Sequence, residues 1–150
     1  MSLKAGDKAP SLLGKDQNGT ILKLEDFKGK KVVLYFYPKD NTPGCTAQAC
    51  NLKDNYDALL KAGYVVLGVS ADTETKHQNF IAKFDLPFPL IADTELELCN
   101  AYGVWQEKKN YGKTYMGIVR TTFVIGEDGT IVDIIEKVKT KEHTSQIIKA

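Results

Sequence analysis

The most constraining feature of the sequence is a nearly continuous apolar run, Val32–Phe36, between Lys31 and Tyr37. Valine, tyrosine and phenylalanine favour extended backbone, and a run without polar alternation is typical of a strand buried on both faces. Pro38 ends this strand, because proline has no N–H to donate to a neighbouring strand. The run therefore predicts the central strand of a sheet that is covered on both sides.

Further strands and turns are predicted along the chain. Asn18-Gly19 precedes the alternating run Thr20–Leu24 and predicts an N-terminal β-hairpin, and Asp128-Gly129 predicts a C-terminal one. Additional strands are expected at Tyr64–Ser70, Leu86–Asp93, Arg120–Ile125 and Thr130–Ile135. We interpret Val104–Gly117, a mixture of polar, glycine and aromatic residues, as a loop.

A long helix is expected directly after the central strand. Thr42 suits its N-cap, Pro43 its first position and Gly63 its end. Apolar side chains recur on one stripe of this helix at Cys45, Ala49, Leu52, Tyr56 and Leu59. Shorter helices are expected at Thr73–Phe84, Thr94–Tyr102 and Glu142–Lys149. Strands that alternate with helices, with hairpins at both ends, predict an α/β sandwich on a mixed central sheet flanked by helices.

Composition limits the classes of function. The 150 residues are 43% hydrophobic with a net charge of +1, which fits one globular domain spanning residues 1–150. No basic run indicates nucleic acid or a membrane surface, and no apolar stretch suggests a signal peptide or a membrane span. We therefore expect a cytoplasmic protein, in which three cysteines would not form structural disulfides.

Cys45 is a candidate nucleophile because of its predicted place at the third position of the long helix. The first N–H groups of a helix lack internal partners and the dipole there is positive, so a thiolate is stabilised. Thr42 could direct its hydroxyl at the sulfur or at a bound oxygen, while Pro38 and Pro43 would stiffen the turn and shield the thiolate. Alternatively, Cys45 is a buried packing cysteine, as free cysteines often are.

Cys50 adds a geometric constraint. Residues five apart on an ideal helix have Cα atoms about 8.7 Å apart, whereas a disulfide tolerates about 7 Å at most. Cys45 and Cys50 therefore cannot bond while the helix is intact, and a bond between them would require the first turns to unwind.

At these residues the sequence resembles the peroxiredoxins. Pro38, Thr42 and Cys45 match the family pattern Pro-x-x-x-Thr-x-x-Cys, and the string from Thr42 to Cys50 is similar to the PrxQ, or bacterioferritin comigratory protein, branch. Gln48 departs from many members, which carry glutamate there. Matching stretches also occur at Lys4–Pro10, Leu67–Ser70, Phe88–Leu90, Tyr102–Trp105 and Arg120–Ile125.

The resemblance implies a thioredoxin-like fold and thiol-dependent reduction of hydrogen peroxide and organic hydroperoxides. Cys45 matches the peroxidatic cysteine and Cys50 the resolving cysteine of members with an intramolecular disulfide, the atypical 2-Cys type. Thr42 and Arg120 match the residues that hold the peroxide oxygens, although an arginine at a strand start is commonly a solvated surface group. Thioredoxin or a similar dithiol would then reduce the disulfide by exchange.

The predicted substrate pocket consists of Pro38, Pro43 and Gly44, and we expect a monomer. Cys99 lies in an apolar helical pattern and is interpreted as core, with a secondary resolving role as an alternative. His77 and His143 are interpreted as solvated. Nothing indicates a metal or another cofactor, since no Cys–His cluster has zinc spacing. Two other functions stay open: a thioredoxin-type thiol–disulfide oxidoreductase, and a redox sensor without turnover.

Overall fold

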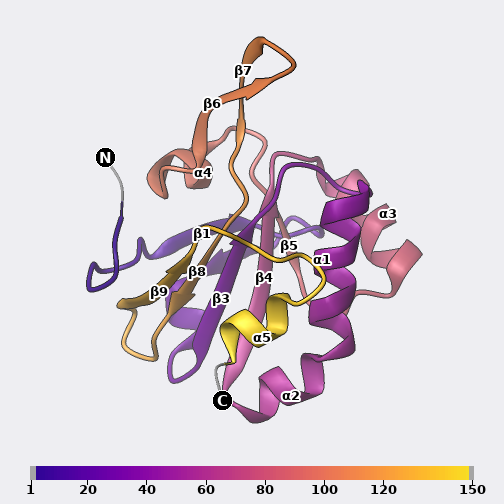
Figure 1. Cartoon of the computed structure of the whole chain (residues 1–150). Coiled ribbons are helices and arrows are strands. Elements are labelled where there is room, and N and C mark those ends of the chain that lie inside the picture. Colours follow the sequence, from indigo (N-terminus) through magenta and orange to yellow (C-terminus); the bar gives the residue numbers. More distant parts are fainter. Residues whose placement is uncertain (1–2, 149–150) are drawn as a thin grey trace.

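The apolar run Val32–Phe36 lies in the middle strand of the main sheet, as predicted. The structure is a computed structural model and describes residues 3–148. Within these residues, five strands form the main sheet in the order β5 (Leu90–Ala92), β4 (Tyr64–Ser70), β3 (Lys31–Phe36), β8 (Thr121–Ile125) and β9 (Ile131–Ile135) (Figure 1). Strand β3 runs parallel to β4 and antiparallel to β8, so the sheet is mixed.

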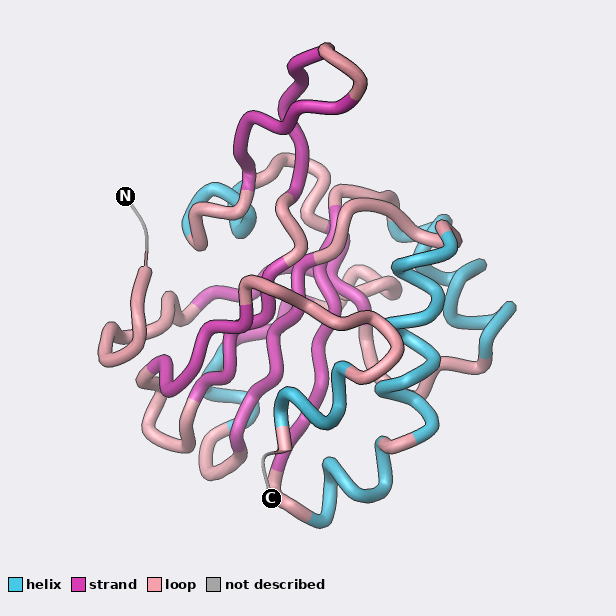
Figure 2. Tube along the Cα trace, viewed as in Figure 1, coloured by secondary structure: helices cyan, strands magenta, loops and turns pink. Residues whose placement is uncertain are grey.

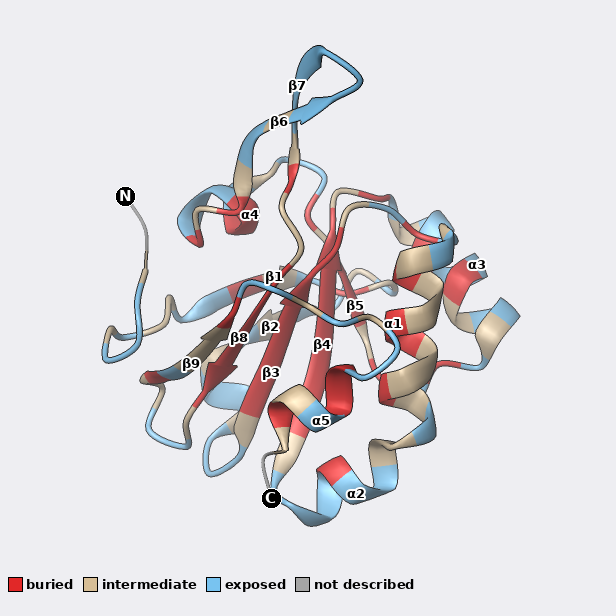
Figure 3. Ribbon diagram, viewed as in Figure 1, coloured by how far each residue is buried: buried red, intermediate tan, exposed pale blue. Residues whose placement is uncertain are grey.

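Alternate residues of β3 pack into two separate apolar cores. Val32, Leu34 and Phe36 face one core, and Val33 and Tyr35 face the other. All five are almost fully inaccessible to solvent, and the central strands are buried along their length (Figure 3). This arrangement explains why the run shows no polar alternation, since neither face of the strand meets water.

Helices cover the Tyr35 face of the sheet. They are α1 (Pro43–Asp54), α2 (Tyr56–Lys61), α3 (Glu74–Phe84) and α5 (His143–Ile147) (Figure 2). Each contributes to the apolar core on that side, for example through Leu52, Leu59, Phe80 and Ile147. The predicted α/β sandwich with flanking helices is confirmed.

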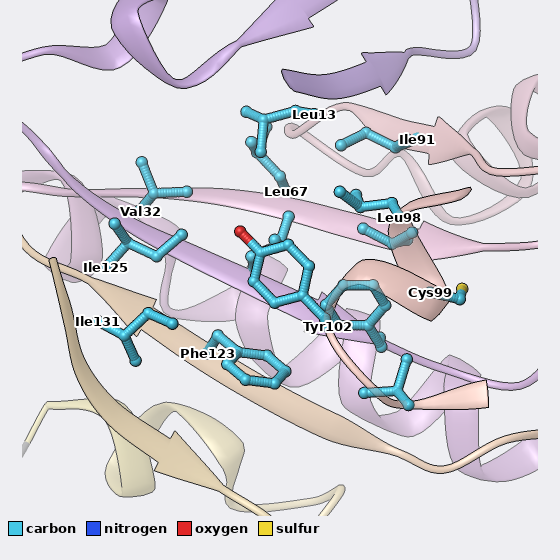
Figure 4. Packing of buried hydrophobic residues seen from close by; sticks show 14 of the residues in the cluster. Leu13, Val32, Leu67, Ile91, Leu98, Cys99, Tyr102, Phe123, Ile125 and Ile131 are labelled. Atoms are coloured by element: carbon cyan, nitrogen blue, oxygen red, sulfur yellow. The ribbon is translucent and has the colours of Figure 1, made fainter. Parts of the chain in front are cut away.

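The opposite face is covered by smaller elements. Strand β1 (Leu12–Lys15) pairs with β2 (Ile21–Lys23) in the predicted N-terminal hairpin, and the short 3-10 helix η1 (Leu24–Phe27) follows. Helix α4 (Glu97–Ala101) lies on the same side (Figure 1). Their buried side chains pack together with Tyr102 and Phe123 (Figure 4). The C-terminal hairpin, formed by β8 and β9, is confirmed too.

The prediction of one continuous helix from Thr42 to Gly63 is wrong, because the structure has two helices, α1 and α2, separated at Asn55. There the side-chain amide donates to the carbonyl oxygen of Asn51, and the backbone leaves helical geometry at φ −111°, ψ 14°. Asparagine competes for backbone partners in this way and so interrupts helices. The apolar stripe nevertheless continues across the break, since Leu52 and Leu59 are both fully buried.

The interpretation of Val104–Gly117 as a loop is wrong. Strands β6 (Trp105–Asn110) and β7 (Lys113–Ile118) form a hairpin that projects from the main sheet (Figure 1). Tyr111 and Gly112 between them both have positive φ, as a tight two-residue turn requires. Most of the hairpin is exposed on both faces, so the apolar alternation that marks a strand is absent.

Two short helices are shorter than predicted. Helix α4 begins at Glu97 rather than Thr94, because the Asp93 carboxylate accepts hydrogen bonds from the backbone N–H groups of Leu98 and Cys99. Helix α5 begins at His143 and ends at Ile147, and the predicted end at Lys149 lies outside the described residues. None of the helices within residues 3–148 has both the length and the apolar character needed to cross a bilayer.

Candidate active site

Cys45 occupies the first turn of α1, where its side chain is 2% exposed. Thr42 is the N-cap, with extended backbone angles, and Pro43 fills the first helical position. The N–H of Thr46 bonds the Thr42 carbonyl oxygen and closes the first turn. The sulfur therefore lies at the positive end of a helix of 12 residues, as the sequence predicts.

Arg120 is not a solvated surface group. Its Nη2 donates to Cys45 Sγ at 3.3 Å, and its Nη1 donates to Gln48 Oε1 at 2.6 Å. The residue lies between β7 and β8, next to the middle strand from which α1 departs. A Cβ atom on Gly44 would lie 3.2 Å from Arg120 Nη2, so this glycine leaves room for the guanidinium group.

Gln48 is fully buried one turn after Cys45. Its Oε1 holds Arg120, while its Nε2 has no hydrogen-bond partner among the described residues. A glutamate at this place would form an ion pair with the guanidinium group and offset its charge. The neutral amide instead fixes the orientation of Arg120 and leaves its positive charge facing the sulfur.

Thr42, predicted to hold a peroxide oxygen, and the residues predicted to form the pocket differ in their surroundings. Thr42 does not cap the helix with its side chain: Oγ1 donates to the Lys39 carbonyl oxygen at 2.9 Å. Its hydroxyl oxygen can still accept a hydrogen bond from a ligand. Pro38 is half-buried, whereas Pro43 is exposed at the start of α1.

The three cysteines are all reduced, and their environments are unequal. Cys50 is half-buried on α1, five residues after Cys45. Cys99 belongs to the apolar core on the opposite face of the sheet from Cys45 (Figure 4). Burial, and then the neighbouring Asp93 carboxylate, raise the pKa of the Cys99 thiol far above its usual value. These features agree with the interpretation of Cys99 as core rather than as a resolving cysteine.

The interpretation of both histidines as solvated is wrong, because each is completely buried. His77 Nδ1 lies 2.6 Å from Asp40 Oδ2, and its Nε2 lies 3.0 Å from the Ile91 carbonyl oxygen. Asp40 also accepts from Tyr37 Oη and donates its backbone N–H to Asp72. The loop before the Cys45 helix is thus tied to α3 and β5.

His143 is buried on the same face of the sheet, in α5. Its Nε2 lies 2.8 Å from Thr122 Oγ1, and burial lowers its pKa. Both histidines have polar neighbours in the sequence and lie outside any periodic apolar pattern, so the sequence does not indicate that they are buried.

Asp40, Asp72 and His77 form the group of potential metal ligands within residues 3–148, with their ligand atoms inside 4.8 Å of one another. The side-chain hydrogen bonds of this group satisfy both ring nitrogens of His77 and both carboxylate oxygens of Asp40. We therefore interpret this group as a hydrogen-bond network that holds the loop before α1 in place.

Lys108 is a neighbour of the site that the sequence does not reveal. It lies on the β6–β7 hairpin, and its Nζ donates to the carbonyl oxygen of Ile118, two residues before Arg120. Burial, and then the charge of Arg120, lower the pKa of Lys108. The hairpin therefore adds a second cation to this side of the Cys45 site.

The chain as a whole is similar to known proteins in sequence and in structure. Residues 5–134 match the AhpC/TSA family. The chain is 46% identical to peroxiredoxin Bcp of Bacillus subtilis, covering 99% of this chain and 95% of that one. It is 47% identical to peroxiredoxin Bcp of Escherichia coli, covering 97% and 94%.

The fold is also similar to those of solved structures. A structure of the bacterioferritin comigratory protein of Xanthomonas campestris, whose study concerns alkyl peroxide reduction, has a TM-score of 0.86 at 37% identity, covering 96% of this chain and 94% of that one. A cysteine mutant of PrxQ from Xylella fastidiosa has a TM-score of 0.89 at 35% identity, covering 98% and 94%.

Fold and comparisons together define a thioredoxin-like thiol protein. The chain belongs to the AhpC/TSA family, and within it to the Bcp/PrxQ branch of the peroxiredoxins. The predicted fold and the predicted class of enzyme, a thiol-dependent peroxidase, are confirmed with it.

Proposed function

We propose that Cys45 is the peroxidatic cysteine, and that it reduces hydrogen peroxide and organic hydroperoxides. The observation that carries this proposal is the hydrogen bond from Arg120 Nη2 to Cys45 Sγ at the N-terminus of α1. A guanidinium group and a helix N-terminus both favour the thiolate, which is the nucleophilic form of cysteine.

In the first step the Cys45 thiolate attacks the terminal oxygen of the hydroperoxide. A sulfur–oxygen bond forms, the oxygen–oxygen bond breaks, and the alkoxide or hydroxide leaves with a proton as alcohol or water. Arg120 has fixed donors that can stabilise the charge on the leaving oxygen. Thr42 can accept a hydrogen bond from the substrate, because its own proton is used by Lys39. Cys45 becomes a sulfenic acid.

In the second step Cys50 attacks the oxidised sulfur, which makes this an atypical 2-Cys enzyme. A disulfide forms, the sulfur–oxygen bond breaks and water leaves. The two residues are five apart on α1, so their Cα atoms are separated by about 8.7 Å in an ideal helix. Resolution therefore requires the first turns of α1 to unwind, and it breaks both hydrogen bonds of Arg120.

Thioredoxin or a similar dithiol protein completes the cycle in this proposal. The dithiol supplies two electrons and becomes a disulfide, while Cys45 and Cys50 return to thiols. We further propose that the enzyme acts as a monomer in the cytoplasm.

Mass spectrometry after one equivalent of hydrogen peroxide tests the cycle. We expect a Cys45–Cys50 disulfide in the wild type and a trapped sulfenic acid on Cys45 in Cys50→Ser, whereas Cys45→Ser consumes no peroxide. Full activity of Cys45→Ser would refute the proposal that Cys45 is the peroxidatic cysteine. A Cys45–Cys99 disulfide would show that Cys99, and not Cys50, is the resolving cysteine. Oxidation that thioredoxin does not reverse would instead favour a redox sensor.

A further inference from the structure

Asn51, the residue after Cys50, ties α1 to the C-terminal part of the chain. Its Nδ2 donates to the Lys141 carbonyl oxygen at 2.8 Å. Its Oδ1 accepts from both the backbone N–H and the hydroxyl group of Thr144, each at 2.8 Å, and Thr144 Oγ1 also approaches the Asn51 carbonyl oxygen at 3.3 Å. Both atoms of the amide group are thus bonded to α5 or to the segment before it.

A second anchor lies on the other side of Cys45. Asp40 is bonded to Tyr37, His77 and Asp72, and its own side chain is 5% exposed. The segment between the two anchors contains Cys45 and Cys50. Cys50 is adjacent to the anchor at Asn51. Cys45 lies farther from both anchors, five residues after Asp40 and six residues before Asn51.

The anchored segment has enough length to rearrange between fixed ends. The part of this segment that unwinds runs from the N-cap Thr42 to Asn51, and its nine steps span about 13 Å as a helix and about 30 Å when extended. Unwinding therefore provides slack of roughly 15 Å, and Cys45 can reach Cys50 without displacement of either anchor. Within the segment, the interactions of Cys45 and Gln48 with Arg120 must break. The backbone hydrogen bonds of the first turns of α1 must break as well, including the one that closes the first turn.

We propose that Asn51 is a positioning residue for the resolution step. It holds Cys50 against the body of the protein through α5, while the first turns of α1 unwind and bring Cys45 to it. This inference rests on the proposed function of Cys45 and Cys50, and it adds that the two cysteines move unequally: Cys45 travels and Cys50 stays in place.

The test separates oxidation of Cys45 from its resolution in Asn51→Ala. In rapid-quench mass spectrometry we expect sulfenic acid to form within twofold of the wild-type rate. Disulfide formation should be at least about tenfold slower, because Cys50 is no longer held, and more sulfinic acid should accumulate at the same peroxide concentration. A purely structural role would slow both steps together, so the difference between the two rates is the informative measurement.

Asn100→Ala is the matched control, since among the described residues its exposed side-chain amide bonds the backbone carbonyl of Leu96 at the start of α4, on the other face of the sheet from α1. It should resolve within twofold of the wild type. Disulfide formation in Asn51→Ala at the wild-type rate or faster would overturn the inference while leaving the proposed function intact. A wild type that forms no Cys45–Cys50 disulfide would overturn both.

Hydrogen exchange provides a second measurement on the wild type. In the disulfide form we expect the amides of residues 46–49, whose N–H groups are the first to bond within α1, to lose protection by about a hundredfold or more. The Thr144 amide, which donates to Asn51, should keep its protection within about threefold. Loss of protection in α5 together with α1 would show that the anchor releases, and would contradict the proposal.

Discussion

Replacing Arg120 by methionine should slow the oxidation of Cys45 strongly without preventing folding. Methionine keeps an unbranched stem but removes the guanidinium group, and with it the donor that lies 3.3 Å from Cys45 Sγ and the donor that lies 2.6 Å from Gln48 Oε1. A hydrogen bond to a charged group contributes roughly 1.5–3 kcal/mol. Since about 1.4 kcal/mol corresponds to a factor of ten in rate, the loss of the sulfur contact alone predicts a decrease of about 10- to 150-fold.

The same substitution should also cost stability, because Gln48 is completely buried and loses its partner. A buried polar group without a hydrogen bond costs roughly 1–3 kcal/mol, which should appear as a lower free energy of unfolding in urea. Arg120→Lys keeps the charge but not the planar pair of donors, so its rate should lie between those of the wild type and the methionine variant.

The assay is the rate of sulfenic acid formation on Cys45, measured by rapid-quench mass spectrometry in the Cys50→Ser background. Lys113→Met is a suitable control, because it removes an exposed cation from β7 on the projecting hairpin. We expect the control to react within twofold of its parent. If Arg120→Met also reacted within twofold at neutral pH, the reasoning that Arg120 stabilises the thiolate and the leaving oxygen would be refuted.

Three further predictions concern other parts of the molecule. Cys99→Ser should turn over peroxide within twofold of the wild type, because Cys99 lies in the core on the opposite face of the sheet from Cys45; a tenfold loss would contradict this. Gly68→Ala should lower the free energy of unfolding by roughly 1–3 kcal/mol in urea, since a Cβ atom there would lie 2.6 Å from Leu90 Cδ2; an unchanged stability would show that Leu90 can move aside. Burial lowers the pKa of His143 in the folded state, so the unfolded chain binds more protons than the folded chain at acidic pH. The free energy of unfolding should therefore decrease as the pH drops below about 6.5, by up to roughly 1.4 kcal/mol per pH unit. Urea unfolding of His143→Asn between pH 7 and 5.5 should show a smaller decrease, and an equal decrease would assign the effect to other groups.

The sequence alone predicts the central strand, the hairpins at both ends of the chain and the helix that follows Thr42. These features follow from local rules: a run of β-prone apolar residues, turns that favour glycine, and capping residues at a helix start. The positions of Cys45 in the first turn of this helix and of Cys50 five residues later were also predictable.

The position of Arg120, in contrast, depends on the tertiary fold. Seventy-five positions separate it from Cys45 along the chain, and only the pairing of β8 with β3 brings it next to the helix start. The buried His77 and His143 and the anchoring role of Asn51 depend in the same way on partners distant in the chain. The β6–β7 hairpin was missed for a different reason: both its faces are largely exposed, so no hydrophobic period marks it. Local sequence thus specifies that a thiol lies in the first turn of a helix, whereas strand order and packing specify which charge faces that thiol and which contacts hold Asn51.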